Sequence, residues 1–363
     1  MYGATIGKVG ILDIESTTNQ ACCACVCYKG IWNWYLLYYL LAQRDYFISK
    51  GFGGAQPNIS REKIVTTLFP LPSLSEQKRI VSEIERIFEQ IEVVKANQEE
   101  LSKLKDGLKN KILDLAIQGK LVEQDPIDEP ASELLKKIKA EKAELVKQGK
   151  IKKDKQESRI FKGDDNRHYE QIGSEVRDIT DEIPFEIPNN WEWVRLDEIT
   201  SYIQRGKSPQ YSDIKVIPVI SQKCVTKEGL KISPAKFINP HSLDTYSKER
   251  FLTNGDLLWN STGTGTVGRV AIYYASDNSY KIAVTDSHVT VVRPILIIPE
   301  YLCYYLTSPA VQDSIEDICD GSTNQKELSL TTVKKYLITL PPLQEQYRII
   351  KRLTEIMKVI ELL

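Results

Sequence analysis

The chain has 363 residues, 42% of them hydrophobic, which is enough for two or three domains with a sizeable core. Its 48 Lys and Arg residues nearly balance 49 Asp and Glu residues, so the formal net charge is -1. This balance excludes a protein that coats nucleic acid through bulk positive charge, so any DNA contact must use local patches. No apolar run reaches the roughly 18 residues of a membrane-spanning helix, and the first residues lack a signal-peptide pattern.

Four of the seven cysteines lie in one short apolar run, at Cys22, Cys23, Cys25 and Cys27. Neighbours along a strand cannot readily bridge one another, and no CxxC pair is followed by histidine partners. The run favours a buried strand of small residues over a metal site. Cysteine usage of this kind is typical of a reducing compartment, so we expect a cytoplasmic protein.

Residues 1–72 are recognised as a module because a second copy follows later in the chain. Residues 69–80 (FPLPSLSEQKRI) match residues 338–349 (ITLPPLQEQYRI), which places Glu76 opposite Glu345 at an offset of 269 positions. Slightly smaller offsets extend the match upstream, pairing residues 38–40 with 304–306 and residues 5–9 with 266–270. The chain therefore contains a duplication, of which residues 5–94 are the first repeat and residues 191–363 the second repeat.

The two repeats are unequal. About 75 residues, from 191 to 266, precede the glycine-rich match in the second repeat, whereas residues 1–4 alone precede it in the first. The helix that begins at the LPxLxEQxRI motif also runs further in the first repeat. The first module thus lacks its front part, and the second lacks the rest of its helix.

A long helix is predicted over residues 73–118. Ser73 or Ser75 can cap its start, and Gly119 ends it. Its apolar residues follow a 4,3 spacing for about five heptads, which favours a coiled coil within the chain or with a partner. The seam starts at Ile80, Ile84, Ile87, Ile91 and Val94 and continues through Leu101, Leu104, Leu108, Ile112 and Leu115.

Residues 119–186 are predicted to be a polar helical linker. Residues 133–155 are lysine-rich with a weak apolar face, which favours a solvated helix over a DNA-backbone contact. Residues 164–177 have little apolar content and are predicted to be a loop. Asp125, Asp128 and Glu133 resemble a nuclease carboxylate set, but their position on a linker argues against catalysis.

Residues 187–342 are predicted to be a mixed α+β domain of about 150 residues. Short β-rich runs alternate with turn signals such as Asn254-Gly255, and two helices are expected near the end. The expected strands are 216–220, 257–259, 267–274 and 288–292, and the expected helices are 301–307 and 311–318. A short helix over 343–363 repeats the coiled-coil seam with Ile349, Leu353, Ile356, Ile360 and Leu363.

Polar segments of this domain can hold phosphates or read base edges. Residues 261–268 (STGTGTVG) combine glycines with hydroxyls, but they fit neither a Walker A loop nor a Rossmann fingerprint. A tight turn between strands is the alternative, and the partial recurrence at residues 3–7 favours function. The candidate DNA-binding residues are Arg205, Lys207, Ser208, Gln222, Lys223, Thr262, Thr264, Thr266, Asn324, Gln325 and Lys326.

Catalysis has little support in the sequence. The chain has three histidines, and no Ser/His/Asp or Cys/His arrangement, nucleotide-binding loop or helicase signature is apparent. The Asn/Asp-Pro-Pro-aromatic motif of amino-methylating enzymes is also missing. We therefore expect a non-catalytic protein that needs no cofactor or metal.

The repeated LPxLxEQxRI motif leading into a heptad helix resembles the specificity subunits of type I restriction-modification systems. Other segments share the likeness: YGATIGKVGI at 2–11, TNQA at 18–21, KILDLAIQGKLV at 111–122 and IPNNWEWVRLDEI at 187–199. The resemblance covers nearly the whole chain outside residues 164–177. The motif with its heptads, present twice, is specific, whereas the glycine loops alone would not be.

The resemblance implies an α+β fold with two target-recognition domains joined by long antiparallel coiled-coil helices. Each domain would read half of a bipartite site in double-stranded DNA, methyltransferase subunits would dock on the helices, and restriction motor-nuclease subunits would complete the complex. The implied boundaries are 1–72 (partial first domain), 73–118, 119–186, 187–342 (second domain) and 343–363. In the first repeat, Lys8, Gln20 and Gln56 would face DNA.

The departures from the family leave alternatives open. The part of the first domain that would match residues 191–260 is absent, and the final helix is short. Either a partner chain supplies the missing pieces, or the chain is a truncated or silent variant. A scaffold that binds methyltransferase subunits through its coil without reading DNA is the competing function.

Overall fold

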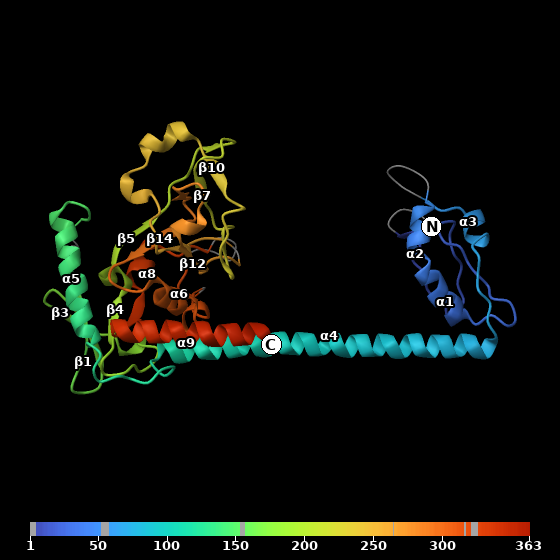
Figure 1. The fold of residues 1–363 in the computed structure, drawn as a ribbon, viewed down its shortest axis with the longest axis horizontal. Helices are drawn as coiled ribbons and strands as arrows, with labels where there is room; N and C mark the ends of the chain where they lie inside the picture. Colours follow the sequence, from blue (N-terminus) through green and yellow to red (C-terminus); the bar gives the residue numbers. More distant parts are fainter. Residues whose placement is uncertain (1–4, 52–57, 153–156, 264, 316, 321–325) are drawn as a thin grey trace. The chain divides into compact units, whose positions relative to one another are not determined.

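The computed structural model describes residues 5–51, 58–152, 157–263, 265–315, 317–320 and 326–363. The chain divides into two compact units, unit 1 (Met1–Lys103) and unit 2 (Leu104–Leu363). Figure 1 shows unit 1 around the N label and unit 2 around the sheets. In the described part of the chain, no helix is both long and apolar enough to cross a bilayer.

Unit 1 is helical. It contains α1 (Asn33–Ala42), α2 (Arg44–Ser49), α3 (Arg61–Val65) and residues 74–103 of α4 (Leu74–Ile117). Its small core consists of the buried Ile6, Phe47 and Ile59, with Leu40 and Ile64 packed against them. Among residues 5–51 and 58–103 the structure contains no β-strand.

The buried strand expected at the cysteine run is wrong. Residues 22–27 are irregular, and Cys22 and Cys25 are exposed. The run is apolar in composition, but the described part of unit 1 brings no sheet against it, so its side chains stay at the surface.

The long helix α4 has 44 residues, as the heptad pattern indicates. The Ser73 hydroxyl accepts the Glu76 N–H at 3.3 Å and so caps the start. Just past the end, Gly119 adopts φ +68°, and a Cβ there would lie 2.4 Å from Pro188 Cγ.

The last helix, α9 (Leu343–Leu362), packs against the C-terminal end of α4. Figure 1 shows the two running antiparallel inside unit 2. The buried Ile349, Leu353 and Ile360 of α9 share a core with residues of α4, and Ile356 is partly buried against it. N-terminal to this contact, the apolar seam of α4 is exposed in this chain, at Ile87, Ile91, Val94, Leu101, Leu104 and Leu108.

Unit 2 is built on antiparallel sheets. The central sheet has the order β12-β11-β14-β5, and a mixed sheet has the order β13-β7-β10-β6. A two-stranded ladder pairs β15 with β4, and another pairs β8 with β9. The strands are β4 (Glu192–Arg195), β5 (Thr200–Arg205), β6 (Tyr211–Ser212), β7 (Pro218–Ile220), β8 (Val225–Thr226), β9 (Gly229–Leu230), β10 (Lys236–Ile238), β11 (Asp256–Asn260), β12 (Val270–Tyr273), β13 (Val284–Thr285), β14 (Val289–Pro294) and β15 (Leu337–Leu340).

The helices of unit 2 cover these sheets. They are α5 (Ala131–Lys147), α6 (Pro299–Thr307), α7 (Pro309–Gln312), α8 (Leu330–Lys335) and α9. The helix expected over residues 311–318 is therefore wrong in extent, because the α-helix there ends at Gln312. The mixed α+β class is confirmed.

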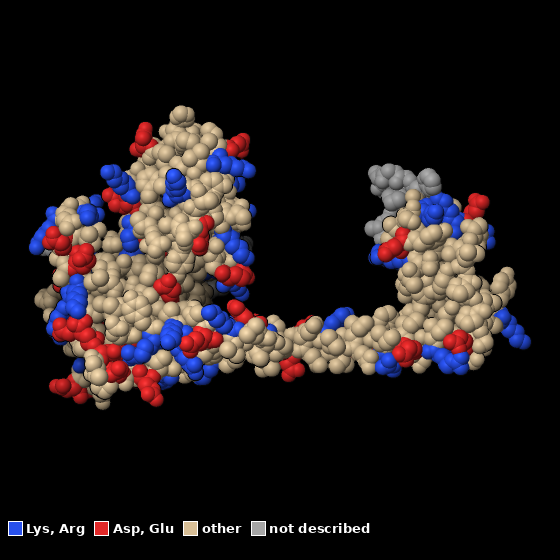
Figure 2. All heavy atoms as spheres, viewed as in Figure 1, with Lys and Arg blue, Asp and Glu red and all other residues tan. Residues whose placement is uncertain are grey.

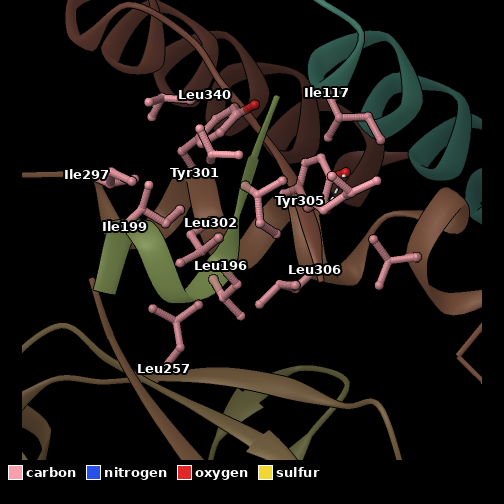
Figure 3. Close-up of a cluster of buried hydrophobic side chains, with 14 of the residues drawn as sticks. Ile117, Leu196, Ile199, Leu257, Ile297, Tyr301, Leu302, Tyr305, Leu306 and Leu340 are labelled. Atoms are coloured by element: carbon pink, nitrogen blue, oxygen red, sulfur yellow. Dashed lines mark hydrogen bonds between the residues drawn. The ribbon is translucent and has the colours of Figure 1, made fainter. Parts of the chain in front are cut away.

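The core of unit 2 forms where α6 meets the sheets and the end of α4. Figure 3 shows Tyr301, Leu302, Tyr305 and Leu306 of α6 turned toward Leu196, Ile199 and Leu340, with Ile117 of α4 at the edge of the cluster. All of these side chains are fully or almost fully buried. Truncating one such side chain to Ala typically costs about 2–5 kcal/mol.

The loop expected at residues 164–177 is wrong. A three-stranded antiparallel sheet forms there, from β1 (Ser158–Lys162), β2 (His168–Ile172) and β3 (Glu175–Asp178). The buried Glu170 of β2 bonds Arg195 of β4, at 2.9 Å to Nε and 2.7 Å to Nη2. Polar strands of this kind are held by a distant ion pair, which no local apolar pattern reveals.

Within its described residues, up to 152, the lysine-rich segment is helical over α5, and the apolar face of this helix is not solvated. Leu134 and Ile138 are buried in the core of unit 2, and the Lys142 ammonium donates to the Asp197 carbonyl at 2.7 Å. This helix is therefore part of the domain, not a free linker.

The duplication is visible in matching hydrogen bonds. In the second repeat, the Gln346 amide accepts the Ile298 N–H at 3.1 Å and donates to the Pro341 carbonyl at 3.0 Å. In the first repeat, the Gln77 amide accepts the Trp32 N–H at 2.8 Å and donates to the Pro72 carbonyl at 2.9 Å. Each glutamine is fully buried and ties the start of one helix to the start of another.

Two tyrosines and one serine of the second repeat also have counterparts in the first repeat that make the same hydrogen bonds. Tyr301 and Tyr305 donate to the carbonyls of Thr339 and Leu337, and Tyr35 and Tyr39 donate to those of Pro70 and Leu68. The helix caps also correspond, since Ser329 accepts the Thr332 N–H and Ser60 accepts the Lys63 N–H. The two repeats therefore share one local architecture.

Candidate nucleic-acid interface

The candidate residues of unit 2 gather at one edge of the central sheet, where β5 and β11 end and β14 begins. The ladder sets Trp259 and Asn260 at the end of β11 beside Thr290 and Val289 at the start of β14. Thr290 in turn pairs with Arg205, the last residue of β5. Because these ends line up at one edge, the segments 206–208, 261–269 and 286–288 leave the sheet together.

The glycine-rich segment is a compact turn. Gly263 and Gly268 adopt φ of +111° and +86°, and Thr266 donates its hydroxyl to Gln222 Oε1 at 3.2 Å. The Asn260 amide donates to the Gln222 carbonyl at 3.1 Å. Two contacts thus hold residues 221–223 against the glycine turn. Thr264 lies outside the described residues.

Segment 326–328 closes the other side of the cluster. Thr262 and Glu327 form a β-bridge, and the Leu328 N–H donates to the Ser261 carbonyl at 2.8 Å. Arg205 donates to Glu327 Oε1 at 2.6 Å and to the Leu328 carbonyl at 2.7 Å. Lys326 is half-buried at the start of this segment, and Asn324 and Gln325 lie outside the described residues.

The segment after β5 is anchored within the domain. The Lys207 ammonium donates to Thr245 Oγ1 at 2.8 Å and lies 5.1 Å from the centre of the Tyr246 ring. Ser208 is exposed, with its hydroxyl 3.4 Å from that of Ser287. A Cβ on Gly206 would lie 2.1 Å from the Asp286 carbonyl oxygen, so this close approach requires glycine.

Three further polar residues lie at this edge and were not among the candidates selected from the sequence: Asp286, His288 and Arg269. His288 is exposed, with Nδ1 2.6 Å from the Thr262 hydroxyl, and its backbone N–H donates to Asp286 at 2.9 Å. Burial raises the pKa of the Asp286 carboxyl. A lone histidine carries no local signal. Arg269 did carry a signal in the sequence, because the duplication aligns it with Lys8, which was selected as a candidate.

Arg269 and Lys8 follow equivalent turns. The Arg269 N–H bonds the Thr266 carbonyl at 3.3 Å and the Lys8 N–H bonds the Thr5 carbonyl at 3.1 Å, with a left-handed glycine between in each case. Lys8 and Gln20 are exposed in unit 1, and Gln56 lies outside the described residues.

Charge at the surface is mixed. Figure 2 shows Lys and Arg side chains interspersed with Asp and Glu side chains over unit 2. At the candidate edge Lys223 is exposed and Arg269 half-buried, while Arg205 is occupied by Glu327. Contact with DNA phosphates at this edge would thus rely on individual side chains such as Lys223 and Arg269, not on a broad positive surface.

The carboxylates that resembled a nuclease set have structural partners. Asp128 accepts two bonds from Arg348, at 3.0 and 2.5 Å, which tie the segment before α5 to α9. Glu133 pairs with Lys136 one turn along α5. Within the described residues, no group of three or more His, Cys, Asp or Glu side chains could hold a metal ion.

Comparison with known proteins places both repeats in one family. The family model described as "Type I restriction modification DNA specificity domain" matches residues 1–103 and 188–363. The EcoAI type I restriction enzyme specificity subunit of Escherichia coli is 36% identical over 258 residues, covering 69% of this chain and 39% of the relative. The EcoEI specificity subunit of the same species is 33% identical over 259 residues, again covering 69% and 39%.

The chain spans about two fifths of the length of these two relatives. A solved structure described as "Structural basis underlying complex assembly and conformational transition of the type I R-M system" has a TM-score of 0.52 and 18% identity, covering 90% of this chain and 64% of that one. This likeness shows the shared fold. The chain belongs to the family of type I restriction-modification DNA specificity domains.

Proposed function

We propose that this chain reads part of a bipartite DNA target for a type I restriction-modification complex. The observation that carries the proposal is the shared edge of the central sheet at which β5 and β11 end and β14 begins. Five segments that are distant in sequence meet there and present hydroxyl, amide, imidazole and cationic groups. Such groups bond both phosphates and base edges.

The residues at this edge have different roles in the proposal. Lys223 and Arg269 hold phosphates, and base edges are faced by Thr262 from the glycine turn and by His288 from segment 286–288. Arg205 positions segment 326–328 through Glu327, so that Lys326 is held beside the turn. Lys207, Ser208, Gln222 and Thr266 shape the neighbouring loops. Thr264, Asn324 and Gln325, which lie outside the described residues, remain candidates from the sequence alone.

The proposed partners follow from the helices. The exposed seam of α4 would receive methyltransferase subunits, and restriction motor-nuclease subunits would join that complex. Double-stranded DNA would lie on the candidate edge, and Lys8, Gln20 and Gln56 would contribute from the first repeat. The chain itself would cleave and methylate nothing, and it would act in the cytoplasm, where its free thiols stay reduced.

The test uses the chain assembled with its methyltransferase subunits. A Lys223→Ala, Arg269→Ala double variant should lose specific DNA binding at least tenfold, because each lost phosphate contact weakens binding and lowers its salt dependence. The matched control is Lys147→Ala on α5, whose side chain is 76% exposed. Unchanged DNA binding by the double variant would overturn the assignment of this edge.

A scaffold that binds methyltransferase subunits without reading DNA is the second candidate. The exposed seam at Ile87, Ile91 and Val94 favours it, because these apolar side chains need a partner whether or not DNA is read. The same assay separates the two functions. A wild-type complex that assembles but shows only non-specific DNA binding would support the scaffold.

A further inference from the structure

The side chains of Thr262 and His288 meet at the edge of the central sheet. Thr262 Oγ1 lies 2.6 Å from His288 Nδ1, which is a hydrogen-bond distance. Within the described residues, neither side chain makes another hydrogen bond. His288 is exposed and Thr262 is half-buried. The second imidazole nitrogen, Nε2, and the remaining capacity of the hydroxyl are therefore left for a ligand.

Backbone contacts fix both members of this pair. The Ser261 N–H donates to the His288 carbonyl at 2.9 Å, and the His288 N–H donates to the Asp286 carboxylate at 2.9 Å. On the other side, Thr262 forms a β-bridge with Glu327, whose carboxylate is held in an ion pair. The hydroxyl and the imidazole are thus presented from a rigid frame, so little ordering is needed when a ligand binds.

The hydrogen atoms of the pair determine what it offers a ligand. A hydroxyl carries one hydrogen, and a neutral imidazole carries one on either Nδ1 or Nε2. One of these two hydrogens is used in the bond between Thr262 and His288, so one outer donor and one outer acceptor remain. When the hydroxyl donates inward, Nε2–H is the outer donor and Oγ1 the outer acceptor. When Nδ1–H donates inward, the two roles are exchanged, so both tautomers give the same count.

One donor beside one acceptor matches the major-groove edge of a single kind of base. Adenine presents the N7 acceptor and the N6 amino donor, guanine presents two acceptors, cytosine presents a donor and thymine presents an acceptor. Only adenine therefore satisfies both outer atoms of the pair on one base. With guanine, the acceptor of the pair would face a second acceptor, and that contact would lack a hydrogen, which is unfavourable once water is excluded.

We propose that Thr262 and His288 together read one adenine of the target, pairing their outer donor and acceptor with its N7 and N6 groups. The inference deepens the DNA-reading function proposed above and rests on it. Neither residue suffices alone, because a free hydroxyl rotates to suit a donor or an acceptor and so does not discriminate between bases. Bonded to each other, the two side chains present the pattern that a single Asn or Gln amide presents to adenine.

The test compares the methylation motifs written by complexes that contain the wild-type chain or a variant with the methyltransferase subunits. In Thr262→Val, which removes the hydroxyl and keeps the shape of the side chain, one A·T pair of the motif should become degenerate. The same pair should become degenerate in His288→Ala, and Thr262→Ser, which restores the hydroxyl, should restore it. Discrimination at that pair should fall about tenfold, as for one lost bidentate base contact. The other positions should stay specified.

Modified DNA duplexes test the same contact atom by atom, at about pH 8, where an imidazole is neutral. At the assigned pair, 7-deazaadenine removes the N7 acceptor and purine removes the 6-amino donor. Each should weaken binding by the wild-type complex about fivefold, as for one lost hydrogen bond. In Thr262→Val, one of the two base changes should cost nothing further, because its partner is already missing. A purely structural role of Thr262 would leave both penalties in place.

Thr354→Val makes the same chemical change on the exposed surface of α9 and should leave the motif unchanged. An intact motif in Thr262→Val, a degenerate G·C pair, relaxation of several pairs at once, or base-analogue penalties equal to those of the wild type would each overturn the inference. In all of these results the wild-type complex still writes a motif. A wild-type complex that writes no motif would instead overturn the DNA-reading proposal and this inference with it.

Discussion

Arg205 and Glu327 form an ion pair at 2.6 Å although 122 positions separate them in the chain. The pair joins the end of β5 to segment 326–328, and the same guanidinium holds the Leu328 carbonyl at 2.7 Å. A segment without regular structure is thereby fixed beside the glycine turn. This anchoring pre-organises the edge to which we assign DNA reading.

Arg205→Ala should release segment 326–328. We expect faster amide exchange at residues 327 and 328 and at least a tenfold loss of specific DNA affinity, because the loop must then be ordered on binding. The free energy of unfolding should fall by only about 1 kcal/mol, since Glu327 is half exposed and the pair is screened. Unchanged exchange at residue 328 would contradict the anchoring role.

Ile84→Asp and Ile91→Asp together should abolish assembly with methyltransferase subunits. A charge placed in the apolar seam would be buried without a partner in the complex. The isolated Ile91→Asp single variant should unfold at nearly the wild-type temperature, because Ile91 is 41% exposed in this chain. Size-exclusion chromatography with the subunits reads out assembly.

Ala96→Asp is the control for the seam variants, because residue 96 is exposed and lies on the helix face opposite the seam. It should assemble normally. Normal assembly of the seam variant would refute the proposed docking role of α4.

Leu353→Ala should destabilise the contact between α9 and α4. Leu353 is fully buried, and its truncation should lower the free energy of unfolding of unit 2 by about 2–5 kcal/mol. Leu362→Ala, at a position that is 87% exposed, should change it by less than about 0.5 kcal/mol. Denaturant titration compares the two, and equal effects would show that α9 does not pack as described.

Glu170 should make the stability of unit 2 depend on pH. Burial opposes its ionisation, but hydrogen bonds from Arg195, Ser158 and Arg177 outweigh burial and lower its pKa from 4.5 to about 2. Because the folded pKa lies below the unfolded value, its contribution is full above about pH 5 and is lost as the pH falls toward 2.

Glu170→Gln isolates this contribution. At pH 7 the variant should be less stable than the wild type by about 3 kcal/mol, because the buried Arg195 would lose its buried charged partner and keep only the more exposed Glu182, 2.8 Å away. The difference should shrink as the pH falls from 5 toward 2. A difference that stays constant over that range would show that the ionised carboxylate is not what the variant removes.

Much of the architecture was predictable because it repeats. The LPxLxEQxRI motif marks the starts of α4 and α9, and the buried Gln77 and Gln346 explain physically why that glutamine occurs twice. The heptad spacing gave the length of α4. The sheet β1-β2-β3 was missed because its strands are polar and are held by the contact between Glu170 and Arg195, which lie 25 positions apart.

The candidate site was predictable only in part. Gln222, Thr262 and Thr266 were selected as small polar residues near glycines, and the fold brings them together with Arg205. The internal engagement of Arg205 and Lys207 was not foreseeable, because their partners, such as Glu327 and Thr245, lie far along the chain. His288 had no sequence signal, since its place is set by the ladder between β11 and β14.

Mapping methylated bases in host DNA, with and without this gene beside its methyltransferase gene, tests the central claim most directly. DNA reading by this chain predicts that a bipartite methylated motif disappears on deletion and returns with the wild-type gene. The Lys223→Ala, Arg269→Ala variant should fail to restore it. A methylation pattern that is the same with and without the gene would contradict the claim.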